Sequence, residues 1–256
     1  MEAFRREGLI ADGPPIVAVN QNSSDPHYVP TTDHNAPIRE RDFVLLDVWG
    51  KKNTPGAVYY DISWTGFVGR SVPDRIGEIF DIVRRSRDAG VEKVTKAIAS
   101  GQKLAGWEVD KAARDVLETA GYAKYLNNRV GHSIGTEVHG YDGYGANIDN
   151  FESHDEREVL PNTCFSIEPG IYLPEFGLRS EVNMLVRAGS AEVTGRIQEE
   201  MILIGLRVLA PRSLARRAHL FGSRQASQLL FYLAFPSGGD NFPMSGNDLG
   251  ATNMRS

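Results

Sequence analysis

Residues 43–67 read FVLLDVWGKKNTPGAVYYDISWTGF and contain two apolar segments joined by a turn. Phe43–Trp49 is a continuous apolar run that includes one acid, Asp47. Ala57–Phe67 is rich in β-branched and aromatic residues and also includes one acid, Asp61. The linking residues 51–56, KKNTPG, combine Asn, Pro and Gly, which favour turns. The stretch therefore predicts a β-hairpin with a buried carboxylate in each strand.

The rest of the chain alternates predicted helices and strands without a regular strand–helix–strand order. Apolar residues recur at helical spacing over Arg75–Ser100 and Val109–Ala120, and a glycine follows each segment. Short apolar runs predict further strands at Ile16–Asn20, Val130–Ile134, Thr163–Ile167 and Glu181–Val186. This order favours an α+β fold over a doubly wound parallel sheet.

The two acids of the hairpin are the first chemical signal. A carboxylate in an apolar strand is costly to bury unless it is paired or binds a metal. A salt bridge explains either acid alone. Two acids on adjacent strands can point to one face, where they would repel each other without a cation. Asp47 and Asp61 therefore indicate a site for a hard divalent metal.

Three later motifs carry further ligand types. Residues 131–140 read GHSIGTEVHG and place His132 between glycine and serine, with His139 seven residues later. Glu168 ends the apolar run in FSIEPGIY, and Glu181 opens another in GLRSEV. Each of these residues alone is explained by a surface or core role. Together with the two aspartates they give four carboxylates and one imidazole, which suit two divalent ions and hydrolytic chemistry.

Composition limits the other possibilities. The 256 residues carry a formal net charge of −5, with 41% hydrophobic and 24% charged residues. These values are ordinary for a globular protein and argue against a basic nucleic-acid binder. Neither a secretory signal nor an apolar run of roughly 20 residues is found, which predicts a cytoplasmic protein. A single cysteine, Cys164, excludes an internal disulfide and leaves oxygen and imidazole ligands for any metal.

The last part of the chain differs from the rest. Residues 206–256 contain six Arg, two Asp and no Lys or Glu, so they carry a formal charge of +4. Residues 236–256 are rich in Gly, Ser, Asn and Pro. We therefore expect residues 206–256 to form a weakly ordered tail. An amphipathic helix over Leu214–Phe235, on a membrane surface or a partner, is the alternative.

The ordered motifs DVW, YYDIS, VGHSIGTEVH, SIEPGIY and GLRSE resemble those of the metallopeptidases that include methionine aminopeptidase, aminopeptidase P and prolidase. The segments PGAVYYDISWTGFVG and FSIEPGIYLPEFGLRSEV are most similar to the Xaa-Pro aminopeptidase (aminopeptidase P) branch. The resemblance covers about residues 1–205. It implies that these residues form a metallopeptidase catalytic domain with the pita-bread fold, lacking the first helices and the usual N-terminal domain.

The resemblance also implies roles for individual residues. The metal ligands would be Asp47, Asp61, His132, Glu168 and Glu181, with Asp61 and Glu181 bridging two ions. Glu168 would also be the general base, His139 would contact the substrate carbonyl, and His27 would bind substrate and move protons. Arg179 would orient a carboxylate or the substrate terminus. A purely structural role for His27 and Arg179 is the alternative.

The implied activity is hydrolysis of an N-terminal Xaa-Pro peptide bond through a metal-bridging hydroxide. The ions would be two Mn²⁺, with Co²⁺, Fe²⁺ or Zn²⁺ as alternatives. The partners would be peptides with proline at the second position, without nucleic acid or membrane, and a homodimer is compatible with the resemblance. Two alternatives stay open: a prolidase acting on Xaa-Pro dipeptides, and an inactive fragment or binding module of the same fold.

Three positions depart from the family pattern. Thirteen residues separate Asp47 from Asp61, more than is usual, and the extra length falls in the turn. Asn128 stands where related Xaa-Pro peptidases often have histidine, which affects the expected substrate contacts. Val182 replaces the acid that commonly follows the last glutamate ligand.

Overall fold

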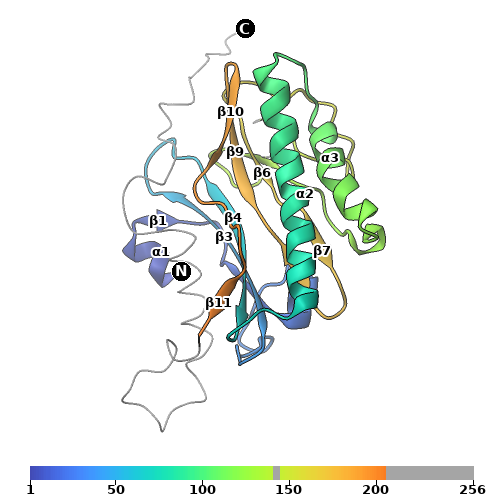
Figure 1. The fold of residues 1–256 in the computed structure, drawn as a ribbon. Helices are drawn as coiled ribbons and strands as arrows, with labels where there is room; N and C mark the ends of the chain where they lie inside the picture. Colours follow the sequence, from blue (N-terminus) through green and yellow to red (C-terminus); the bar gives the residue numbers. More distant parts are fainter. Residues whose placement is uncertain (141–144, 206–256) are drawn as a thin grey trace.

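Two β-sheets and two long helices make up most of the computed structural model, which describes residues 1–140 and 145–205 (Figure 1). The expected tail, 206–256, lies outside these residues. The first sheet has the order β1 (Leu9–Ile10), β3 (Phe43–Lys52), β4 (Tyr60–Val68) and β11 (Ile202–Ile204), and β2 (Ile16–Val19) also pairs with β3. The second has the order β10 (Ser190–Thr194), β9 (Val182–Arg187), β6 (Cys164–Ile167) and β5 (Ser133–Ile134).

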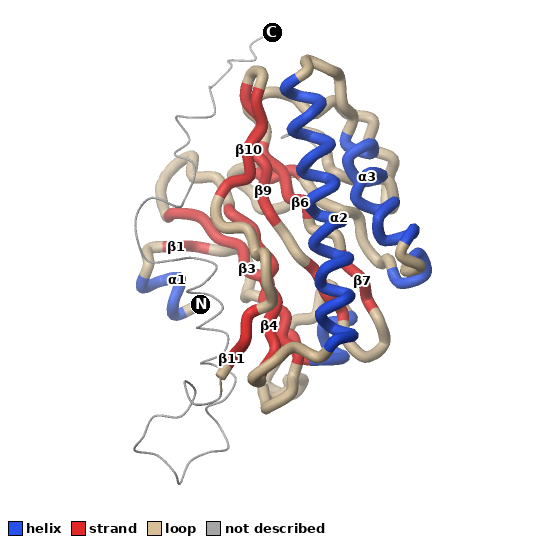
Figure 2. Tube along the Cα trace, in the orientation of Figure 1, coloured by secondary structure: helices blue, strands red, loops and turns tan. Residues whose placement is uncertain are grey.

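The remaining elements are short apart from the two long helices. They are α1 (Glu2–Arg6), η1 (Asn20–Ser24), α2 (Asp74–Ala99), α3 (Gly106–Thr119), η2 (Ala123–Tyr125) and the antiparallel pair β7 (Gly170–Tyr172) and β8 (Gly177–Arg179). Between α3 and β6 the described chain is mostly loops and turns (Figure 2). No helix in the described parts is both long and apolar enough to cross a membrane. The mixture of helices with largely antiparallel sheets confirms the predicted α+β class.

The predicted hairpin is confirmed as β3 and β4, which pair antiparallel from Phe43 to Gly50. Its boundaries differ from the sequence prediction, because β3 continues to Lys52 and β4 begins at Tyr60. The backbone N–H of Tyr59 donates to the carbonyl of Gly135 at 2.9 Å. The start of the predicted second strand therefore pairs with the loop after β5.

The long helix α2 packs on both sheets (Figure 1). Near its beginning, Ile79 and Val83 join a buried cluster with Phe43 of β3. Near its end, Val94 joins a second cluster with Phe165 of β6. Gly101, at φ +69°, follows the helix, as the sequence predicted.

Two buried side-chain amides bind the backbone of β4, which carries Asp61. The side-chain carbonyl of Asn183, on β9, accepts from the backbone N–H of Asp61 at 3.2 Å, and its amide donates to the Asp61 carbonyl. Gln198 accepts from the Thr65 N–H at 3.0 Å and donates to the Thr65 carbonyl at 2.7 Å. The Asn183 bonds fix β4 against β9 and so bring Asp61 toward Glu181, and the Gln198 bonds hold the segment between β10 and β11 against β4.

Several predicted strand limits need correction. The predicted strand Val130–Ile134 is reduced to β5 and an isolated bridge between Gly131 and Ile148. Glu181 lies just before β9 instead of opening it, and Val182 packs in the buried cluster beneath that strand. The strand predicted at Thr163–Ile167 begins one residue later, at Cys164.

Candidate metal centre

Asp47 and Asp61 lie on the same face of the hairpin. Trp49 is directly opposite Asp61 in the register, and Asp47 is two residues from Trp49, so alternation places all three side chains on one face. Both aspartates are buried, at 8% and 4% exposure. The expectation that the register brings the two carboxylates to one face is confirmed.

His132 and Glu168 meet beside this pair. The Nε2 atom of His132 lies 3.2 Å from Glu168 Oε1 and 3.6 Å from Asp61 Oδ2. Its Nδ1 lies 3.2 Å from the Ser133 carbonyl, so an Nδ1–H donated there would leave Nε2 able to coordinate a metal ion. Ser166 donates to Glu168 at 3.0 Å and accepts from the His132 N–H at 3.0 Å, which fixes the spacing of the two side chains.

Glu181 completes a cluster of carboxylates. Asp47, Asp61 and Glu181 each offer an oxygen, and these oxygens lie within 4.8 Å of one another. A second set, with ligand atoms inside the same limit, joins Asp61 to His132 and His139. His139, expected to contact substrate and not metal, therefore lies as close to Asp61 and His132 as a ligand would.

The cluster leaves polar atoms without partners. Asp47 Oδ1, Asp61 Oδ1 and both carboxylate oxygens of Glu181 are buried and accept no hydrogen bond from the described residues. Buried polar atoms are rarely left in this state, because each costs free energy of desolvation. Hard oxygen donors facing one point are the environment that divalent cations use. The residues present therefore fit a divalent-metal site.

Electrostatics of the ion-free cluster agree with this fit. Burial raises the pKa of Asp47 to about 8, although Arg179 opposes the rise. Burial, and then the charge of Asp61, raise the pKa of Glu181 well above its ordinary value. Burial opposes the charged form of His132, but its contacts with Asp61 and Glu168 outweigh burial and raise its pKa to about 10. Burial likewise opposes the charged form of Glu168, but His132, Arg179 and Ser166 outweigh it and lower its pKa to about 2.

Arg179 lies inside this cluster and not at the open side of the pocket. Its guanidinium forms an ion pair with Asp47, donates to Ser63 Oγ at 2.8 Å, and lies 3.7 Å from Glu168 Oε2. The side chain is only 3% exposed. Of the two roles expected for Arg179, this placement favours orienting a carboxylate over binding a substrate terminus.

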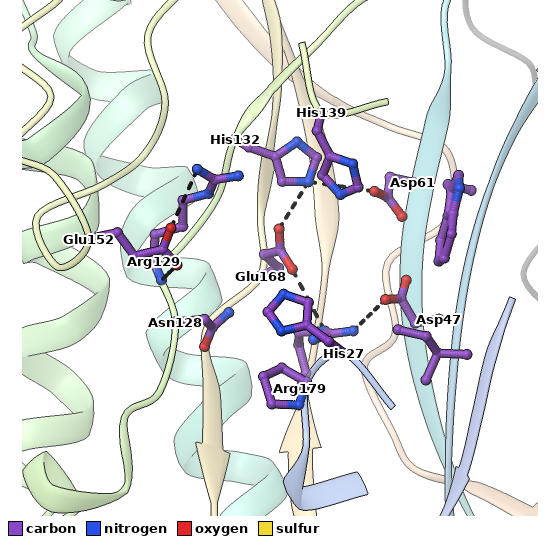
Figure 3. A pocket seen from close by; sticks show the side chains of 13 residues that line it. His27, Asp47, Asp61, Asn128, Arg129, His132, His139, Glu152, Glu168 and Arg179 are labelled. Carbon is purple, nitrogen blue, oxygen red and sulfur yellow. Dashed lines mark hydrogen bonds and ion pairs between the residues drawn. The ribbon is translucent and has the colours of Figure 1, made fainter. Parts of the chain in front are cut away.

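A pocket of about 200 Å³ opens beside the cluster (Figure 3). Asp47, Asp61, His132, Glu168 and Arg179 line it together with the two other expected histidines, His27 and His139. The ring centroids of His132 and His139 are 4.7 Å apart. Burial, and then the charge of His132, lower the pKa of His139. His27 lies at the exposed rim of the pocket, where its backbone N–H donates to Asp25 at 2.9 Å.

Six further residues line the pocket and were not predicted as part of the site, among them Trp49, Asn128, Arg129 and Glu152. Trp49 donates its indole N–H to Asp12 at 2.5 Å. Strand alternation from Asp47 is the signal that could have placed it here. Asn128, noted as a departure from the family pattern, lines the pocket with Arg129 and Glu152. Because the last two come from separate loop segments, no sequence periodicity could have brought them together.

Comparison with known proteins places this geometry in a family. The model of metallopeptidase family M24 matches residues 1–188. The chain belongs to metallopeptidase family M24. The resemblance that the motifs indicated is thereby confirmed, and the five expected ligand residues, from Asp47 to Glu181, fall within the M24 match.

M24 relatives of similar sequence include two dipeptidases. The probable dipeptidase PepE of Mycobacterium tuberculosis is 31% identical over 205 residues, which are 77% of this chain and 49% of that protein. The Xaa-Pro dipeptidase of Lactobacillus helveticus is 31% identical over 167 residues, covering 65% of this chain and 40% of that protein. The chain thus spans about half the length, or less, of these curated relatives.

Solved M24 structures share the fold. Dipeptidase PepE from Mycobacterium ulcerans aligns with a TM-score of 0.67 and 30% identity, covering 80% of this chain and 50% of that one. X-Pro aminopeptidase from Thermotoga maritima aligns with a TM-score of 0.64 and 25% identity, covering 79% and 53%. The fold is therefore the pita-bread fold, as the resemblance implied.

Proposed function

We propose that this chain is the catalytic region of a divalent-metal exopeptidase that releases the N-terminal residue from peptides whose second residue is proline. The observation that carries the proposal is the convergence of ligand-type side chains beside one pocket, where four buried carboxylate oxygens lack hydrogen-bond partners among the described residues. Membership of family M24 supports peptide hydrolysis. Relatives named Xaa-Pro dipeptidase and putative Xaa-Pro aminopeptidase support proline as the residue after the cleaved bond.

The metal ligands in this proposal are those expected from the sequence: Asp47, Asp61, His132, Glu168 and Glu181. The oxygen-rich donor set fits Mn²⁺ best, with Co²⁺, Fe²⁺ or Zn²⁺ as alternatives. When bound, two such ions supply a nucleophilic water at neutral pH and polarise the scissile carbonyl.

The chain's own side chains do the rest of the chemistry. Glu168, held by His132 and Ser166, accepts a proton from the attacking water. It then returns that proton to the leaving nitrogen as the peptide bond breaks. His139, whose ring lies against His132, donates to the oxygen of the scissile carbonyl as negative charge develops there. Arg179 keeps Asp47 oriented, and His27 contacts the substrate at the rim.

A prolidase that acts on Xaa-Pro dipeptides is the second candidate. Two observations favour it. The relatives at 31% identity named above are dipeptidases. The pocket, at about 200 Å³, is also smaller than the roughly 300–1,000 Å³ typical of small-molecule sites, which suits a short substrate.

Mass spectrometry of a peptide mixture tests the proposal. The full chain, loaded with Mn²⁺, is incubated with Xaa-Pro-Yaa tripeptides, Xaa-Pro dipeptides and Met-Ala peptides as controls. Loss of the first residue from Xaa-Pro-Yaa alone would establish the aminopeptidase, and cleavage of dipeptides alone would establish the prolidase. Stoichiometric metal uptake without any cleavage would contradict both and leave a binding module or inactive fragment.

A further inference from the structure

The loop that carries His139 closes on itself directly after β5. The backbone N–H of Gly140 donates to the Ser133 carbonyl at 2.8 Å, and Ser133 Oγ donates to the Gly140 carbonyl. Figure 3 shows the His139 ring beside that of His132. Because His139 is exposed, the backbone of residues 135–139, here called the His139 loop, largely determines where its ring lies.

The β3–β4 hairpin holds the His139 loop at its beginning by two hydrogen bonds. Lys51 Nζ donates to the carbonyl of Thr136 at 2.6 Å. The backbone N–H of Tyr59 donates to the carbonyl of Gly135 at 2.9 Å. The Lys51 ammonium also lies 4.9 Å from the centroid of the Tyr59 ring, a cation–π contact. A hydrogen bond from an ammonium to a carbonyl is charge-assisted, so the Lys51 bond is the stronger of the two.

Apolar packing holds the other end of the loop. Val138, which precedes His139, is only 1% exposed and packs in a buried cluster with Val58 and Tyr59 of the hairpin. This packing and the backbone bond of Tyr59 do not require the Lys51 ammonium. The loop should therefore stay folded if the ammonium is removed, while its first half loses one of its two bonds to the hairpin.

Lys51 shares a strand face with the metal cluster. Alternation along β3 places it on the same face as Asp47 and Trp49. The ring centroids of Trp49 and His139 are 6.5 Å apart. Strand β3 thus carries an expected metal ligand and also holds the loop of the residue expected to contact the scissile carbonyl. The separation between the cluster and the His139 ring is therefore set through this one strand.

We propose that Lys51 is a positioning residue: by holding the Thr136 carbonyl, it keeps the His139 imidazole where it meets the scissile carbonyl in the proposed reaction. The inference rests on the proposed exopeptidase function and adds a residue that touches neither substrate nor metal. Because His139 acts as negative charge develops on the carbonyl oxygen, a displaced ring weakens binding of the transition state more than binding of the substrate. Loss of the ammonium should therefore lower kcat and leave KM nearly unchanged.

Lysine variants test this split between kcat and KM, with whichever peptide the chain cleaves. In Lys51→Met, which keeps the apolar stem, kcat should fall about 10- to 100-fold, as for a small misplacement of a reacting group, while KM stays within about twofold. Metal content should not change. Lys51→Arg, which also donates to a carbonyl, should recover most of the rate. Normal kcat in Lys51→Met, or a fall in metal content as large as the fall in rate, would overturn the proposal.

Lys52→Met is the matched control for these variants. Lys52 follows Lys51 in β3, is exposed, and points to the opposite face of the strand. Its loss should leave kcat and KM unchanged. An equal fall of kcat in both lysine variants would show an effect of surface charge and contradict the role of the Thr136 contact.

A double-mutant cycle separates positioning from a general loss of structure. If Lys51 acts through His139, Lys51→Met should slow the His139→Gln enzyme by no more than about twofold, because the group that it positions is already gone. Losses that simply add in the double variant would refute the proposal.

Nuclear magnetic resonance makes the test independent of turnover. In the full chain with isotope-labelled histidine and no added metal, the ring signal of His139 is identified by its absence in His139→Gln. That signal should shift by more than its line width in Lys51→Met, return in Lys51→Arg and stay in place in Lys52→Met. An unchanged signal in Lys51→Met would refute the role of Lys51 even if the chain proved active. A shifted signal in a chain that cleaves no peptide would uphold the contact between Lys51 and the His139 loop and count against the proposed function.

Discussion

At the scale of single residues, Asp61 joins the two sets of potential ligand atoms. It belongs to the group with Asp47 and Glu181 and also to the group with His132 and His139. Its Oδ1 lacks a hydrogen-bond partner among the described residues, while its Oδ2 lies 3.6 Å from His132 Nε2. A carboxylate that belongs to both groups is suited to bridge two ions.

Asp61→Asn tests that role. The substitution keeps the size of the side chain and removes its charge, so metal content and turnover should fall together. The loss in each should exceed the roughly 10- to 100-fold that is typical when a residue behind a metal ligand is changed. Elemental analysis of the purified variant and a rate assay check both quantities, with Asp81→Asn on the surface of α2 as control. Full metal occupancy at normal rates would rule the assignment out.

The residue types of the site could be predicted from the sequence, but most of their contacts could not. Acids inside apolar strands are unusual enough to single out Asp47 and Asp61 in the sequence. The ordered motifs identified His132, Glu168 and Glu181 as further candidates. Arg129 and Glu152 meet only because a long loop folds back 23 residues later. Asn183, which binds the backbone of Asp61, reads in the sequence as an ordinary strand residue.

At the scale of elements, the helices and strands that were predicted carry a local sequence pattern, whereas those that were missed depend on distant partners. The helices α2 and α3 and the hairpin β3–β4 carry strong periodicity and clear glycine stops, so their existence and approximate ends were predicted. The short strands β1, β7, β8, β10 and β11 were missed, because their pairing depends on distant partners and not on local pattern. The strand β11, for example, pairs in parallel with β4, more than a hundred residues earlier.

Gly131→Ala tests how closely β5 must approach β6. A Cβ at position 131 would lie 2.0 Å from the backbone carbonyl oxygen of Ser166, so the strands must separate and move His132. We expect a loss of about 1–3 kcal/mol in the free energy of unfolding, measured by urea titration, together with weaker metal binding. Gly77→Ala, in α2, meets only Val72 at 4.0 Å and should gain about 0.5–1 kcal/mol instead. Equal effects of the two substitutions would contradict the close approach at Gly131.

At the scale of the whole molecule, the candidate metal centre lies where the two sheets meet. Asp47 and Asp61 come from the first sheet, while His132, Glu168 and Glu181 lie at strand ends of the second. Repulsion within the cluster therefore opposes the packing of one sheet on the other, and bound cations would relieve it. Metal binding and global stability should be linked for this reason.

The direction in which stability changes with pH follows from the pKa values of the metal-free protein. The pKa of Asp47 is raised by burial from 3.8 to about 8, and that of Glu181 is raised too, so ionising these groups lowers stability as pH rises above about 4. Burial opposes the charged form of His132, but the neighbouring carboxylates raise its pKa to about 10. Its contribution to the stability of the folded protein is therefore complete below pH 6.5 and is lost as the pH rises toward 10. The contribution of Glu168, whose pKa is about 2, is lost only in acid.

The metal-free protein should therefore lose thermal stability between pH 5.5 and 8.5, and Mn²⁺ should restore more of it at the higher pH, because the cation favours the ionised carboxylates. At a free concentration a hundred times its dissociation constant, the ion adds about 2.7 kcal/mol. Scanning calorimetry with a chelator and with Mn²⁺ at pH 5.5, 7.0 and 8.5 measures the difference in Tm. Asp61→Asn, if it fails to bind the ions, should show no increment at any pH. An increment in the wild-type chain that did not depend on pH would mean that the buried carboxylates are not the groups that hold the metal.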